Sequence, residues 1–145
     1  MNREILFRGK RVDNGEWVEG SFYQHPMTKD CFILVHDYHS NAVYGFGNLG
    51  CPKFHKVDPD TLGEYTGLTD KNGKKIWEGD ICSADLFIPY KTVIFRNGCF
   101  MYQLNDGDSD YYDIMMPIEP LINADVYTEV IGNIHDNSDL IEECK

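Results

Sequence analysis

The amino-acid sequence predicts a mostly β protein, with a small SH3-like barrel in its C-terminal part, a smaller β unit before it and few short helical turns. Short runs of β-branched and aromatic residues recur along the chain at regular spacing. Asn-Gly pairs at 72–73 and 97–98 lie between such runs, as they do in tight hairpins. No long stretch repeats its apolar residues with a helical period. We assign residues 1–65 to the N-terminal β unit and residues 66–145 to the barrel and a short C-terminal tail.

In the N-terminal unit the sequence predicts strands at residues 4–8, 16–24 and 31–35. The alternation of the second run breaks at Gly20, which predicts a bulge or a bend. The third run, Cys31-Phe32-Ile33-Leu34-Val35, is continuously apolar and is typical of a buried strand. Asp58 and Pro59 predict one helical turn, with Asp58 as its N-cap and Pro59 at its first position.

The stretch from Thr66 to Ile81 organises the rest of the chain. Asn72 and Gly73 both tolerate positive φ, so we expect a type I′ turn there. Gly79 can adopt a backbone conformation closed to residues with a Cβ, and it predicts a sharp bend before the next strand. We expect Trp77 and Ile81 in the core, and Asp80 hydrogen-bonded to backbone amides of the bend. Residues interpreted as structural are Asn72, Gly73, Trp77, Gly79, Asp80, Asn97 and Gly98.

Beyond this stretch the sequence predicts strands at residues 81–88, 91–95, 99–104, 111–116 and 126–134. Asn97 and Gly98 join the second and third of these runs in a second hairpin. The polar residues 137–139 predict the cap of a short C-terminal helical turn that carries Leu140 and Ile141.

Four segments carry a resemblance to a known family. They are residues 3–11 with 14–20, residues 57–65, the central stretch 66–81, and residues 129–137 with Leu140. Together they resemble the YopX family, whose members are small proteins encoded by phages and prophages. Ser138 stands where the family pattern has proline. The resemblance implies a phage or prophage origin and a β-barrel, and it brings no established activity with it.

The sequence favours the cytoplasm of the infected host cell as the location of the protein. No apolar run approaches the roughly 20 residues that span a bilayer, so we expect no membrane insertion. The N-terminus lacks the apolar segment of a signal peptide. The five cysteines are scattered, with no Cys-x-x-Cys pair, which favours reduced thiols over a disulfide framework.

The formal net charge of −11 lies in the second half of the chain. Residues 1–75 hold ten Lys or Arg and ten Asp or Glu, whereas residues 76–145 hold three and fourteen. Such a surface repels nucleic-acid phosphates and attracts basic partners. Ordinary solubilising charge is the more common reason for such an excess.

Two groups of residues resemble metal sites. The stretch from Asp106 to Asp113 begins like a calcium loop, but it has Tyr111 where that loop needs glycine and Pro117 where it needs glutamate. His36, His39, Cys51 and His55 lie near zinc-ligand spacings without a Cys-x-x-Cys pair, and the sequence leaves open whether they converge. Loop and structural roles are the favoured interpretation of both, and we expect no cofactor.

The sequence supports three functional hypotheses. The first is a non-enzymatic module that binds a host or phage protein. The second is a nucleic-acid-binding module, disfavoured by the net charge, with a basic N-terminal segment beside aromatic residues that could stack on single strands. Its candidate binding residues are Arg3, Arg8, Lys10 and Arg11. The third and weakest is a metal-dependent enzyme, because no nucleophile elbow or phosphate-binding loop is present and no catalytic residue stands out. The sequence is also compatible with a homo-oligomer.

Overall fold

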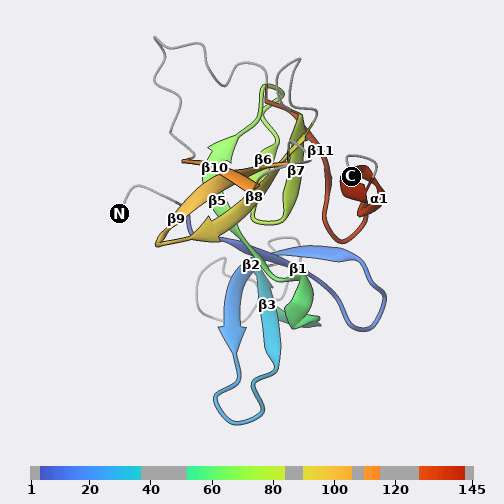
Figure 1. Ribbon diagram of the computed structural model, residues 1–145. Helices are drawn as coiled ribbons and strands as arrows, with labels where there is room; N and C mark the ends of the chain where they lie inside the picture. The colour runs from blue at the N-terminus through green and yellow to red at the C-terminus, as the bar shows by residue number, and fades with distance from the viewer. Residues whose placement is uncertain (1–3, 37–51, 84–89, 106–109, 115–127, 143–145) are drawn as a thin grey trace. The chain divides into compact units, whose positions relative to one another are not determined.

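Strands dominate the computed structural model, which describes residues 4–36, 52–83, 90–105, 110–114 and 128–142 (Figure 1). The elements are β1 (Phe7–Lys10), β2 (Trp17–Gln24), β3 (Cys31–His36), β4 (Pro52–Val57), the 3-10 turn η1 (Pro59–Thr61), β5 (Gly63–Thr69), β6 (Lys75–Trp77), β7 (Asp80–Ser83), β8 (Tyr90–Arg96), β9 (Cys99–Asn105), β10 (Asp110–Ile114), β11 (Val130–Asn133) and α1 (Asp139–Glu142). Helix within these residues is limited to η1 and the four-residue α1, so the predicted mostly β class is confirmed.

The chain divides into two compact units, residues 1–64 and 65–145. In the first unit, antiparallel strands follow the order β4-β3-β2-β1, and the first residues of β5 pair with β1. In the second unit, the remainder of β5 pairs with β6, and the other sheet has the order β10-β9-β8-β7-β11. Among the strands described, β10 and β11 are the two ends of this sheet, which is therefore open. The predicted SH3-like barrel is not confirmed.

The first unit packs one face of its sheet into a core. Its buried residues are Cys31, Ile33 and Val57, with Phe7, Val18, Phe22, Val35 and Leu62 around them. β2 changes partner at Gly20, which pairs with β1, whereas the next residue already pairs with β3. A Cβ at Gly20 would lie 2.1 Å from the Leu34 carbonyl oxygen, so glycine permits this close crossing. The predicted irregularity at Gly20 thus corresponds to a change of pairing partner.

The helical turn after β4 is confirmed with its predicted cap. Asp58 accepts a hydrogen bond from the Asp60 amide at 3.0 Å, and Pro59 occupies the start of η1. The Thr61 hydroxyl oxygen of this turn accepts a hydrogen bond from the Lys10 amide at 2.9 Å. The turn therefore ties the segment after β4 to the end of β1.

The second unit has its own core between β6, β7, β8, β9 and β11. The residues of this cluster are Ile76, Cys82, Val93, Tyr102 and Val130, with Leu68 and Phe100 packed against them. Trp77 and Ile81 are buried, as predicted, with 5% and 0% of their surface exposed. Neither residue belongs to this cluster, which contains their sequence neighbours Ile76 and Cys82 instead. The Trp77 ring packs against the Tyr65 ring, with 5.4 Å between the ring centroids.

The hairpin at Asn97 and Gly98 is confirmed. Arg96 pairs directly with Cys99, so the loop between β8 and β9 has two residues. Asn97 has φ 54° and Gly98 has φ 81°, and positive φ at both central positions is the signature of a type I′ turn.

The predicted type I′ turn at Asn72 and Gly73 is wrong. Gly73 has φ 79°, but Asn72 is not among the positive-φ residues. The Gly73 amide bonds to the Asp70 carbonyl, and the Asp70 amide bonds to the Lys74 carbonyl, so the loop holds three residues. This is a type I turn followed by a left-handed glycine. The reason lies outside the Asn-Gly pair, because the Asp70 carboxylate accepts the Asn72 and Lys74 amides and fixes the longer loop.

Replacing Gly98 with valine should lower the free energy of unfolding by about 1–3 kcal/mol, the cost of a strained backbone conformation. A Cβ at Gly98 meets nothing within 4 Å, so the loss would come from the positive φ and not from a clash. Urea denaturation measures the change. Gly98→Asn is the matched control, because asparagine tolerates this region, and it should unfold close to wild type. Equal midpoints for the valine variant and wild type would contradict the type I′ assignment.

Replacing Trp77 with alanine should cost about 3–5 kcal/mol, the range for truncating a buried aromatic residue. The loss is a large share of the total stability of a small protein, about 5–15 kcal/mol. Thermal unfolding followed by circular dichroism tests this expectation. Were the variant to melt like wild type, Trp77 would not be a core residue.

Candidate protein-binding face

The central stretch of the second unit is held together by the buried carboxylate of Asp70. One carboxylate oxygen accepts the amides of Asn72 at 2.8 Å and Lys74 at 2.9 Å. The other accepts the amide of Val130 at 3.1 Å, sixty residues further along the chain. The side chain therefore joins the turn after β5 to the start of β11.

These hydrogen bonds favour the ionised form of Asp70. Burial alone raises the pKa of a carboxyl group, but the amides of Val130, Lys74 and Asn72 outweigh it and hold the pKa of Asp70 below its ordinary value. Two further contacts support the same junction: the Lys71 amide donates to the Thr128 carbonyl, and the Lys71 ammonium pairs with Glu129. Asp70 thus has a structural role, which sequence reasoning did not single out.

The bend at Gly79 is likewise structural. Gly79 has φ 84°, as its predicted conformation requires, and its amide donates to the Val93 carbonyl at 2.8 Å while its carbonyl accepts from Ile134 at 2.9 Å. Asp80 is 1% exposed and accepts the Trp77 amide at 2.8 Å, which confirms the predicted bond to an amide of the bend. These backbone bonds give Gly79 and Asp80 a structural role.

The predicted basic segment is partly brought together, around an aromatic ring. The Arg8 guanidinium carbon lies 4.7 Å from the centre of the Trp17 ring, and the Lys10 ammonium lies 5.5 Å from it. Arg11 lies apart from them and pairs with Asp13, whose carboxylate raises the pKa of Arg11 by hydrogen bonding. Arg3 lies outside the described residues. These contacts stabilise the β1–β2 ribbon by cation–π interaction and ion pairing.

Of the candidate zinc ligands, only the side chain of His55 lies among the described residues. His39, Cys51 and residues 106–109 lie outside them, as do the side chains of His36 and residues 110–113. Among the described side chains, no group of three or more His, Cys, Asp or Glu could hold a metal ion. Cys31, Cys82 and Cys99 are free thiols, and burial, followed by the charge of Asp80, raises the pKa of Cys82 to about 12. At that pKa the Cys82 thiol is a poor nucleophile near neutral pH.

The sheet of the first unit exposes aromatic side chains on the face opposite its core. Tyr23 on β2 pairs with Phe32 on β3, and their ring centroids are 6.3 Å apart. Leu34 on β3 pairs with Phe54 on β4, and the Phe54 ring meets the Tyr23 ring edge to face at 6.5 Å. Tyr23 remains 42% exposed and Phe54 57% exposed. We call Tyr23, Phe32, Leu34 and Phe54 the aromatic face.

Sequence reasoning missed the aromatic face because it depends on register. Phe22 belongs to the core, whereas the adjacent Tyr23 points to the other side of the sheet. The apolar run of β3 hid the alternation, since Ile33 is fully buried while Phe32 is only partly buried. Only the pairing of three strands brings Phe54 next to Tyr23.

The fold and this face define a two-unit antiparallel β protein with an exposed aromatic surface. The family described as YopX protein matches residues 6–142, so the chain belongs to the YopX family. Protein EF1440 from Enterococcus faecalis, known from a crystal structure, is similar in fold, with a TM-score of 0.54 and 19% sequence identity over 97% of this chain and 99% of that chain. No curated protein matches the chain. Within the described residues, no helix has the length and apolarity needed to cross a membrane.

Replacing Asp70 with asparagine should destabilise the protein at pH 7 by about 1–3 kcal/mol, because a buried amide donor would lose its charged acceptor. Since the folded pKa of Asp70 is lowered, its stabilisation is present above the unfolded pKa of about 4 and is lost as the pH falls through the folded value. The difference in the free energy of unfolding between wild type and Asp70→Asn should therefore become smaller below about pH 4.

Urea denaturation at pH 7 and at pH 3 measures this difference. Asp60→Asn, at an exposed carboxylate, is the control and should unfold like wild type at pH 7. A difference between wild type and Asp70→Asn that stays constant with pH would contradict the role of the ionised carboxylate.

Proposed function

We propose that the protein is a phage or prophage accessory protein that binds a host or phage protein in the cytoplasm of the infected cell, without catalysing a reaction. The observation that carries this proposal is the aromatic face. Protein interfaces are enriched in tyrosine and phenylalanine relative to the rest of the surface, and their binding energy is concentrated in a few such residues. Membership of the YopX family supports the proposed origin.

The aromatic face has the rigidity that an interface needs. Its rings lie on three adjacent strands whose other side is a packed core, so backbone pairing fixes their positions before a partner arrives. Tyr23 combines a large apolar ring with a hydroxyl group. This combination suits a surface that faces water in the free protein and is buried when a partner binds. Burial of Tyr23 and Phe54 would remove exposed apolar surface from water.

Nucleic-acid binding is the second candidate, supported by the placement of Arg8 and Lys10 around Trp17. It is disfavoured by two observations. Arg11, a third member of the predicted basic segment, is neutralised by Asp13. The net charge of −11 also works against phosphate binding, whose affinity depends on lysine and arginine contacts. A protein partner therefore fits the charge and the aromatic face better.

The double variant Tyr23→Ala, Phe54→Ala tests the proposal in affinity capture from infected cells, with quantitative mass spectrometry of the retained proteins. The captured amount of at least one protein should be more than about 10-fold lower with the double variant than with wild type, because truncating aromatic residues at an interface weakens binding by such factors. Ile131→Ala, at a β11 residue with 40% exposure, is the matched control and should retain the partner.

Retention of the same proteins by wild type and the double variant would overturn the role of the aromatic face. Electrophoretic mobility shifts with single- and double-stranded probes form a separate arm. Salt-sensitive binding that is lost in Arg8→Ala, Lys10→Ala would favour the nucleic-acid alternative instead.

A further inference from the structure

The outer edge of β4 is closed at one end by the segment that follows β1. The Val12 amide donates to the Lys56 carbonyl at 3.0 Å, and the Asp58 amide donates to the Lys10 carbonyl at 2.8 Å. Between these bonds, Arg11 and Val57 form an isolated antiparallel bridge. The Lys56 carbonyl therefore points away from β3, the strand that pairs with β4 on its other side.

The same edge continues to Phe54, where it has no partner among the described residues. Alternate residues of a strand direct their N–H and C=O groups to the same side, so those of Phe54 point outward like the carbonyl of Lys56. No bond from a described residue reaches them. At Pro52, two residues earlier, the edge lacks an N–H group. Phe54 is thus the residue that offers both a donor and an acceptor on this part of the edge.

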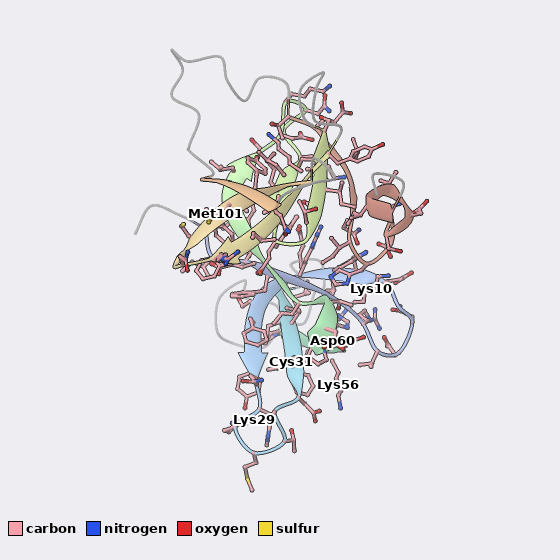
Figure 2. All side chains as sticks on the ribbon, viewed as in Figure 1. Lys10, Lys29, Cys31, Lys56, Asp60 and Met101 are labelled. Atoms are coloured by element: carbon pink, nitrogen blue, oxygen red, sulfur yellow. The ribbon has the colours of Figure 1, made fainter. Side chains whose placement is uncertain are left out.

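A lysine shares one face of β4 with Phe54. From Ser21 to Asp58, the described residues carry three lysines and two carboxylates, although the whole chain has a net charge of −11. Lys29 lies at the turn between β2 and β3, and Lys56 lies on β4 (Figure 2). Lys56 shares its strand face with Phe54, two residues away, and forms a half-exposed ion pair with Asp30 at 2.9 Å. An acidic ligand at this edge would meet a lysine that already binds a carboxylate.

We propose that the partner contributes a short, acidic, extended segment that adds as a strand to the outer edge of β4 at Phe54. This inference rests on the proposed function and names the chemistry of its partner. The segment would bond through its backbone to the N–H and C=O of Phe54 and place an apolar side chain against the ring of Phe54. An acidic residue of the segment, two positions from the apolar one, would lie on the same face and reach Lys56. The added strand must end at Lys56, because the Val12 amide already bonds to the Lys56 carbonyl.

A synthetic peptide with the sequence Ser-Glu-Thr-Val-Thr-Glu-Ser tests the mode of binding, because its symmetry serves parallel and antiparallel pairing alike. Titration into isotope-labelled full-length protein, followed by NMR, should shift the amide signals of Phe54 and Lys56 and slow hydrogen exchange at the Phe54 amide. The counterpart with lysine in place of both glutamates should bind at least about 10-fold more weakly, because it places like charges near Lys56. Equal binding of the two peptides would overturn the acidic preference.

Two pairs of variants sharpen the test. Asp30→Asn releases Lys56 from its ion pair and should tighten binding of the acidic peptide about two- to fivefold, whereas Lys56→Glu should abolish it. Phe54→Ala removes the ring, and Phe54→Pro removes the ring and the outward N–H, so the proline variant should bind more weakly than the alanine variant. The fingerprint spectrum of each variant shows whether it is folded.

Unchanged hydrogen exchange at the Phe54 amide with saturating acidic peptide, or no shift with either peptide, would overturn strand addition. The proposed function would still be tested separately by the affinity capture, because loss of the cellular partner in the double variant does not depend on the peptide. Retention of that partner by the double variant would overturn the proposed function itself.

Discussion

The second unit depends on one carboxylate that satisfies backbone amides from two distant parts of the chain. Asp70 accepts amides from its own turn and from Val130, and the neighbouring bonds of Lys71 join the same two segments. A buried amide without an acceptor is costly, so this carboxylate can be replaced by few side chains of similar shape. Residues after 128 thereby reach the core through a polar junction as well as through apolar contact.

Other residues of the central stretch also satisfy backbone groups. Asp80 is also buried and bonded to an amide, and Gly79 exchanges backbone bonds with Val93 and Ile134. Carboxylates engaged in this way stabilise turns. The stretch from Thr66 to Ile81 is therefore a folding element of the second unit, as its turn-rich sequence indicates.

Sequence reasoning succeeded where the signal and its cause lie within a few residues. Asn97-Gly98, Asp58-Pro59 and the bend at Gly79 are local conformations, and all three are confirmed. It failed at Asn72, because a side chain two residues earlier selects a different turn. Prediction of the aromatic face requires the register of three strands, which no local pattern supplies. A one-residue shift of that register would exchange the core face and the exposed face. Barrel closure is likewise a property of long-range pairing, and it is not confirmed.

The aromatic face and the Asp70 junction lie in different units. Tyr23 and Phe54 are exposed on a sheet whose core is formed by the opposite face, so their replacement removes little buried contact. Asp70 and Asp80 instead accept hydrogen bonds from backbone amides of the second unit. Substitutions on the aromatic face therefore need not weaken the second unit. Exposed side chains of the first unit can therefore change while the folding element of the second unit is kept.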